Sequence, residues 1–136
     1  MPNTNLQQLY QTANQQLQKG QYAQAWESFQ KILQADNNHL LALLGMGRLL
    51  VKNKKYSEAL PYLERLVHLH PPTFEGWSVL GIAYAKTEDK RALAALRKAL
   101  NLVEKKTPQW AEVLYQMTKL LRDSEQPVES EKLVDR

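Results

Sequence analysis

A repeat spacing of about 34 residues recurs along the chain and constrains the fold more than any other feature. Tyr22 and Tyr56 show this spacing, and so do Ala25 and Ala59. Further positions keep it: Phe29 with Leu63, Ile32 with Leu66, Asn37 with Pro71, and the series Leu9, Leu43, Trp77 and Ala13, Gly47, Gly81. A period of this length predicts a stack of similar supersecondary units, each of which covers the apolar face of its neighbour.

The residues within each period indicate paired helices. Apolar side chains recur at steps of three and four residues, as from Tyr22 to Leu33, which is the stripe of an amphipathic helix. Small residues recur from unit to unit in both helices of a pair, for example at Gly47 in the first helix and at Ala59 in the second. They would let the two antiparallel helices approach closely. The expected helices span residues 5–18, 22–35, 40–52, 56–69, 74–86, 90–104, 108–123 and 127–135.

The segment from Trp77 to Tyr84, with the sequence WSVLGIAY, resembles the opening signature of a tetratricopeptide (TPR) repeat. The segments Tyr22–Ala25 and Tyr56–Ala59 are similar to the family's second-helix opening, and Pro71 matches the proline that ends a repeat. The resemblance implies an all-α, right-handed helical solenoid of about three TPR-like helix pairs plus a degenerate fourth, capping pair. It implies a single domain over residues 1–136, with units at residues 6–39, 40–73, 74–106 and 107–136.

Two departures from the regular period are expected to change the structure locally. Ala92 follows Ala59 one residue earlier than the full period requires, so the turn of the third pair is shorter, and it lacks the aromatic residue of the first two pairs. The fourth unit begins three residues later than the period requires and ends in a short charged segment at 127–134. This segment is expected to act as a polar cap.

Composition narrows the possible partners. The net charge of +4 is a mild excess, whereas nucleic-acid binders carry a denser basic stripe with stacking aromatics, so no nucleic-acid partner is expected. Residues 1–10 have neither the basic stretch nor the apolar run of a secretory signal. The most apolar segment, residues 40–51, is shorter than the roughly 20 residues of a membrane span. We therefore expect a cytoplasmic protein without membrane insertion.

The sequence shows no arrangement of residues that would support catalysis. Gly45 and Gly47 begin like a dinucleotide fingerprint, but Leu50 stands where the third glycine belongs, so helix packing is the expected role. The chain has three histidines and no cysteine, too few converging ligands for a metal site. We expect no catalytic residue, no metal, no cofactor and no enzymatic activity.

In TPR proteins the first helix of each pair lines a concave groove that holds a segment of a partner. The resemblance therefore implies a protein-interaction scaffold. The candidate partner-binding residues are Tyr10, Asn14, Leu44, Arg48, Lys52, Ile82, Lys86, Tyr115, Lys119 and Arg122. Because apolar and cationic side chains are combined, the expected partner is a protein or peptide with acidic and apolar side chains.

One well-known groove chemistry of the family is not expected here. The positions of its two-carboxylate clamp for chaperone tails correspond to Tyr10, Asn14, Gly45, Glu75 and Val79. Only Asn14 matches, and Glu75 would repel a carboxylate. Two other functions remain open: a self-associating assembly module that forms homo-oligomers, and a targeting or adaptor domain of a larger enzyme or secretion machine.

Overall fold

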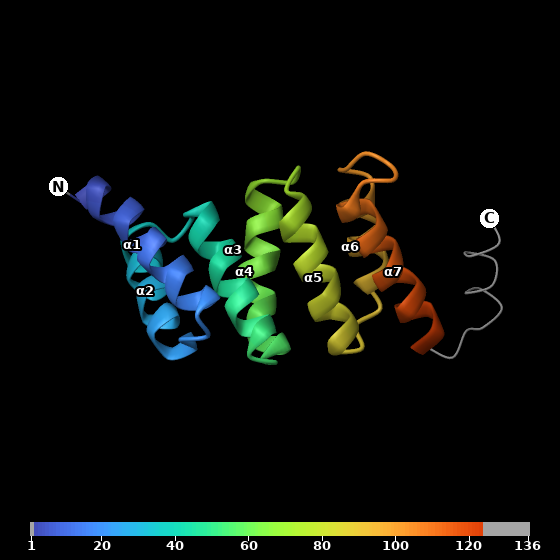
Figure 1. Ribbon diagram of the computed structural model, residues 1–136, viewed down its shortest axis with the longest axis horizontal. Coiled ribbons are helices and arrows are strands. Elements are labelled where there is room, and N and C mark those ends of the chain that lie inside the picture. Colours follow the sequence, from blue (N-terminus) through green and yellow to red (C-terminus); the bar gives the residue numbers. More distant parts are fainter. Residues whose placement is uncertain (1, 124–136) are drawn as a thin grey trace. The chain divides into compact units, whose positions relative to one another are not determined.

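The computed structural model describes residues 2–123, with side chains described from residue 6 onward. Two compact units make up the chain, Met1–Pro71 and Pro72–Arg136. Within residues 2–123 there are seven helices and no strand, which confirms the expected all-α class (Figure 1). That the whole chain forms a single domain stays a prediction.

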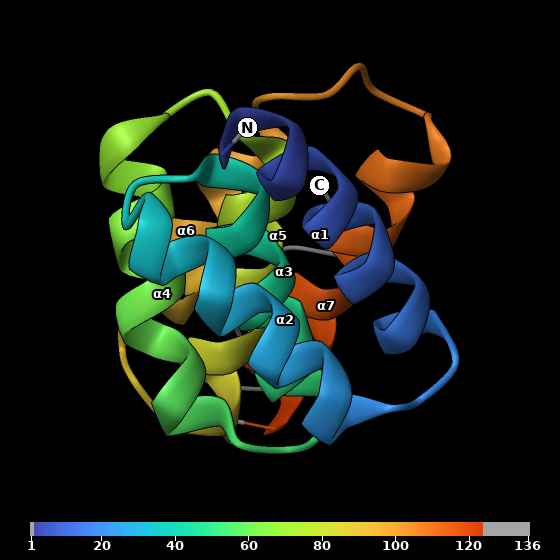
Figure 2. The ribbon, with the colours of Figure 1, turned by 90° about the vertical axis from the view of Figure 1, so that its left-hand side faces the viewer.

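The first unit contains two antiparallel helix pairs (Figures 1 and 2). Its helices are α1 (Pro2–Gln18), α2 (Tyr22–Ala35), α3 (Leu40–Lys52) and α4 (Tyr56–Leu69). Helix α1 packs on α2, α3 packs on α4, and α2 joins the pairs by packing on α3. Phe29, Ile32, Met46 and Leu63 fill the space between them with completely buried side chains.

Small residues allow these helices to approach closely, as the repeat predicts. A Cβ atom added at Gly47 would meet the side chain of Leu63 on the paired helix α4. One added at Gly45 would meet Phe29 on α2 of the preceding pair. Both glycines are buried within α3, so the interpretation of these glycines as packing residues is confirmed.

The first helices α1, α3 (Leu40–Lys52) and α5 (Phe74–Lys86) end in the same turn. The residues at positions 20, 54 and 88 share the repeat spacing, and Gly20, Lys54 and Glu88 have φ angles of +77°, +61° and +58°. The next amide in each turn donates to a carbonyl five residues back, for example from Lys55 to Leu50 at 2.7 Å. This is the Schellman ending of a helix, in which one residue with positive φ reverses the chain.

The second unit consists of α5 (Phe74–Lys86), α6 (Ala92–Leu100) and α7 (Pro108–Asp123). Its buried cluster is formed by Leu96 and Ala99 of α6 with Val113 and Met117 of α7. Trp77 of α5 packs against this cluster. Threonine hydroxyls cap the N-termini of α5 and α7. The Thr73 hydroxyl accepts a hydrogen bond from the Gly76 amide at 3.1 Å, and the Thr107 hydroxyl accepts one from the Trp110 amide at 3.2 Å.

Helix α6 is shorter than predicted, since it spans Ala92–Leu100 instead of residues 90–104. Gly81 faces Leu96 as Gly47 faces Leu63, although Gly81 and Leu96 are one residue closer in the sequence than Gly47 and Leu63. Ala92 therefore takes the place of Ala59, and the missing residue removes the first turn of the helix. At the other end, the amide of Leu102 donates to the Ala99 carbonyl at 3.0 Å in a tight turn, which ends the helix early.

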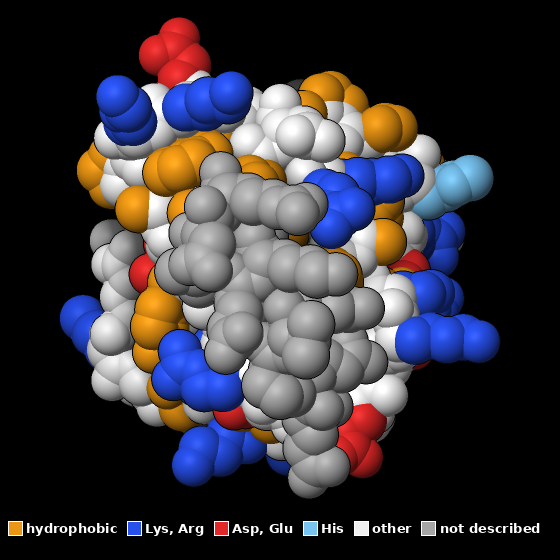
Figure 3. Space-filling view, turned by 90° about the vertical axis from the view of Figure 1, so that its right-hand side faces the viewer, with side chains coloured by type: hydrophobic (Ala, Val, Ile, Leu, Met, Phe, Trp, Pro, Cys, Tyr) orange, Lys and Arg blue, Asp and Glu red, His pale blue; other side chains and the backbone are white. Residues whose placement is uncertain are grey.

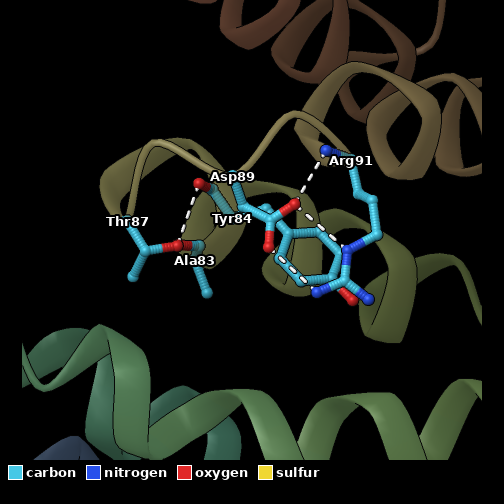
Figure 4. A network of polar contacts seen from close by, with 5 residues as sticks. All are labelled: Ala83, Tyr84, Thr87, Asp89 and Arg91. Carbon is cyan, nitrogen blue, oxygen red and sulfur yellow. Dashed lines mark hydrogen bonds and ion pairs between the residues drawn. The ribbon is translucent and has the colours of Figure 1, made fainter.

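A network around Asp89 replaces that missing helical turn (Figure 4). One carboxylate oxygen of Asp89 accepts hydrogen bonds from the Arg91 backbone amide at 2.9 Å and from Nε at 3.1 Å, and the other accepts from Nη2 at 2.9 Å. The Arg91 guanidinium lies 4.5 Å from the centre of the Tyr84 ring, within range for a cation–π interaction. The hydrogen bonds from the Arg91 side chain and backbone lower the pKa of Asp89 to about 2.

The remaining helix bounds agree closely with the prediction. Helices α2, α3, α4, α5 and α7 begin and end at the expected residues, and α1 begins earlier, at Pro2. The helix expected at 127–135 lies outside the described residues.

Candidate partner-binding surfaces

The first helices of the first unit, α1 and α3, contact each other and carry five of the predicted residues. Tyr10 and Asn14 of α1 are half-buried. The Tyr10 ring lies 6.3 Å from that of Phe29 and 6.5 Å from that of His39. Tyr10 is therefore held by the core along part of its ring, and only the remainder is available to a partner.

A stripe of side chains runs along α3. Leu44 and Arg48 are half-buried and Lys52 is exposed, at steps of four residues, so the three lie on one face of the helix. Leu41, one turn earlier, has half of its side chain exposed, at 50%. We call Leu41, Leu44, Arg48 and Lys52 the α3 stripe. It combines two leucines with two cations.

In the second unit, α5 and α7 enclose a small hollow of about 80 Å³. Three predicted residues line it together: Ile82 and Lys86 from α5 and Lys119 from α7. The other lining residues are Ala85, Leu96, Gln116, Leu120 and Asp123. We call this the α5–α7 hollow. Its wall is half apolar and half polar, and its two lysines come from different helices.

The remaining two predicted residues extend this surface along α7. Tyr115 lies four residues before Lys119 and Arg122 three residues after it, so all three share one face of the helix. The Tyr115 side chain is 56% exposed, the largest value among the exposed large hydrophobic residues. Spacing on a helix was enough to predict this face. Gln116 and Asp123 were not predicted, because their part in the hollow depends on how α7 packs on α5.

The structure also bears on the chaperone-tail clamp. Gly45, at one of the clamp positions, is buried against Phe29, so a side chain could not project from it toward a partner. Glu75 is exposed in the first turn of α5, where its negative charge would repel a carboxylate. These positions support the expectation that no such clamp forms.

The described residues contain no group of three or more His, Cys, Asp or Glu side chains arranged to hold a metal ion. Nδ1 of His39 accepts a hydrogen bond from the Ala42 amide at 3.2 Å, so this histidine caps α3. His68 and His70 are exposed at the end of α4. Within residues 2–123, no helix is long and apolar enough to cross a bilayer.

Helix pairs with small-residue contacts recur at a spacing of about 34 residues, and α1, α3 and α5 end in the same turn. These features define a helical-repeat protein of the TPR class. The family described as "Cilia and flagella-associated protein 70 middle TPR-like domain" matches residues 1–104. The chain belongs to this TPR-like family, which confirms the resemblance found in the sequence.

A sequence relative and a solved structure are consistent with this family assignment. "Tetratricopeptide repeat protein 1" of Schizosaccharomyces pombe is 33% identical over 89 residues, a stretch that covers 63% of this chain and 9% of that protein. The chain thus spans only a small part of the length of this relative. The structure of MamA (residues 41 to the end) from Desulfovibrio magneticus RS-1 has a TM-score of 0.86 and 26% identity, and the match covers 96% of this chain and 72% of that one.

A second solved structure holds a bound peptide. The first TPR of Spaghetti (RPAP3) bound to the HSP90 peptide SRMEEVD matches with a TM-score of 0.76, covering 86% of this chain and 93% of its own. Its sequence identity of 19% makes this a likeness of fold.

Proposed function

We propose that this chain is a protein-interaction module that binds a partner segment with acidic and apolar side chains on the faces of its first helices. The observation that carries the proposal is the α5–α7 hollow, which brings Ile82, Lys86 and Lys119 together from two helices. Ile82, Ala85, Leu96 and Leu120 suit an apolar side chain, and the two lysines suit a carboxylate placed on the side of the hollow away from Asp123. The peptide in the Spaghetti (RPAP3) complex supports the general mode, because it is held by a domain of the same fold.

Apolar anchors and charges have different roles in such a site. Tyr115 and Ile82 would supply most of the affinity, because buried aromatic and aliphatic contacts dominate interfaces. Lys86, Lys119 and Arg122 would mainly speed association and select acidic partners. Salt should weaken binding only modestly, since exposed charges are screened over ~8 Å at physiological ionic strength.

The α3 stripe of the first unit has the same combination of side chains, with Leu41 and Leu44 beside Arg48 and Lys52. We include it in the proposal as a second contact region for the same kind of segment. The proposal also includes a cytoplasmic location and the lack of enzymatic activity, as the sequence leads us to expect.

The test compares charge reversals that differ only in position. A partner is first captured from a lysate of the native organism, identified and purified, and its affinity for the chain is measured by calorimetry. Lys86→Glu with Lys119→Glu should weaken binding by about tenfold or more, because both changes place a carboxylate beside the acidic segment. Lys31→Glu with Lys105→Glu is the matched control, since both lysines are exposed and lie outside the first helices.

Equal affinities of the two double variants for the partner would contradict the proposal. Circular dichroism of each variant separates a local effect from unfolding.

A further inference from the structure

The outer side of α6 carries a concentration of positive charge that the proposed function does not use. Between Lys90 and Val103 the chain has four basic residues and no acidic one. Lys90, Arg97 and Lys98 are all exposed. Figure 3 shows one face of the molecule, on which Lys and Arg side chains lie next to hydrophobic ones. Three of these four cations therefore face solvent with no acidic residue between them in the sequence.

These cations surround a hollow that is separate from the α5–α7 hollow. Its volume is about 460 Å³, and it is lined by Lys90, Leu93, Ala94, Arg97, Lys98 and Asn101. Leu93 is half-buried and, with Ala94, provides an apolar floor. We call it the α6 outer hollow. It has no lining residue in common with the α5–α7 hollow, so the two surfaces can be changed independently.

One of its cations is already held in place. Nζ of Lys98 lies 4.6 Å from the centre of the Trp77 ring, within range for a cation–π interaction. Ordering this side chain before binding reduces the conformational entropy that association would cost. Lys98 is thus prepared to meet an anion at one end of the hollow.

An adjoining hollow restricts which way an acidic ligand can lie. It shares Lys90 and Leu93 with the α6 outer hollow and is also lined by Glu88, Asp89 and Asp123. These carboxylates would repel an acidic group placed on that side. The acidic groups of a ligand are therefore expected near Arg97 and Lys98, with the apolar group on Leu93 and Ala94.

We propose that the α6 outer hollow binds an acidic segment of a partner protein, with one aliphatic side chain on Leu93 and Ala94 and carboxylates at Arg97 and Lys98. The hollow itself favours a protein over a membrane, because a flat lipid surface cannot fill a depression, whereas a projecting side chain can. Single-stranded nucleic acid would need exposed aromatic rings for its bases to stack on. Trp77, the nearby ring, is half-buried and covered by Lys98. This surface lies on a second helix and does not depend on the first-helix proposal.

The test uses fluorescence anisotropy of a labelled 12-residue peptide of Glu, Ser and Leu, titrated with the full chain. In one control peptide every Glu is replaced by Gln, and in the other every Leu is replaced by Ser. Arg97→Glu with Lys98→Glu should weaken binding about tenfold or more, and Lys86→Glu with Lys119→Glu should change it less than about twofold. Ala94→Tyr, which fills the hollow without changing its charge, should also weaken binding.

The proposal would be overturned if the peptide did not bind at millimolar protein, or if both double variants lost the same amount of affinity. It would also be overturned if the peptide with Ser in place of Leu bound as tightly as the parent peptide. Binding to phosphatidylserine vesicles without binding to the peptide would make the surface a membrane site. Peptide binding that appears only when Glu125, Glu129 and Glu131 are changed to Gln would make the chain's own acidic C-terminal residues the occupant. Because the Lys86 and Lys119 variants test the first-helix proposal separately, failure of one proposal leaves the other standing.

Discussion

Asp89 occupies the position at which the first two helix pairs carry a tyrosine. Tyr22 precedes Ala25 by three residues, as Tyr56 precedes Ala59 and Asp89 precedes Ala92. A carboxylate cannot pack as a tyrosine does. It accepts hydrogen bonds from Arg91 instead, and the guanidinium of Arg91 covers the Tyr84 ring. At this turn a charged pair of Asp89 and Arg91 therefore stands where the other two turns have a tyrosine.

This arrangement predicts an acidic titration for Asp89. Its pKa is lowered from 3.8 to about 2, first by the hydrogen bond from the Arg91 side chain. Because the folded pKa lies below the ordinary value, the ionised carboxylate stabilises the turn above pH 3.8, and this contribution is lost as the pH falls toward 2. Carboxyl-detected NMR should place the midpoint near 2 and find it higher in Arg91→Gln. Arg97→Gln is the control, and a shift of equal size in that variant would contradict the role of Arg91.

Packing glycines could be predicted residue by residue, whereas the turn residues could be predicted only in part. Gly47 recurs as Ala13 and Gly81 at the repeat spacing, and Gly45 lies in a helical pattern with no third glycine at Leu50, so a packing role followed from sequence. Gly20 indicated a turn by its residue type, but the equivalent positions hold Lys54 and Glu88, which ordinarily avoid positive φ. At these two positions the helix ends on either side impose the conformation, and residue type alone does not signal it.

At the scale of elements, the bounds of a helix could be predicted from sequence where capping and breaking residues fall at the positions that the repeat period requires. Thr107 followed by Pro108 marks the start of α7, since the threonine caps the helix and proline suits its first residue. Helix α6 has no such signal at its start. Its prediction was wrong at both ends because the one-residue deletion fell within its first turn and a tight turn ended it at Leu100.

The close helix approach predicts that enlarging a buried alanine destabilises the fold. Ala25 of α2 is completely buried, so Ala25→Leu should lower the free energy of unfolding by ~1–3 kcal/mol through overpacking. Ala23→Leu is the matched control, because Ala23 is exposed on the same helix. Urea denaturation followed by circular dichroism measures both. A midpoint for Ala25→Leu equal to that of Ala23→Leu would mean that no close helix contact exists at Ala25.

At the scale of the whole molecule, the repeat and the family were accessible from sequence, whereas the hollows were not. The repeat period identified the TPR class, and helical spacing placed Ile82, Lys86 and Lys119 on first-helix faces. A hollow, however, depends on the distance between packed helices. That is why Gln116 and Asp123, and the whole of the α6 outer hollow, became visible only in the structure.

The central claim is that first-helix faces hold the partner, and site-specific photocrosslinking tests it most directly. Tyr115 on the first helix α7 and Trp26 on the second helix α2 are aromatic residues with exposed side chains, at 56% and 39%. Each would be replaced in turn by the photoreactive benzoylphenylalanine, and the chain would be irradiated with its purified partner. The account predicts a covalent adduct from position 115 and none from position 26. An adduct from position 26 with none from position 115 would contradict it.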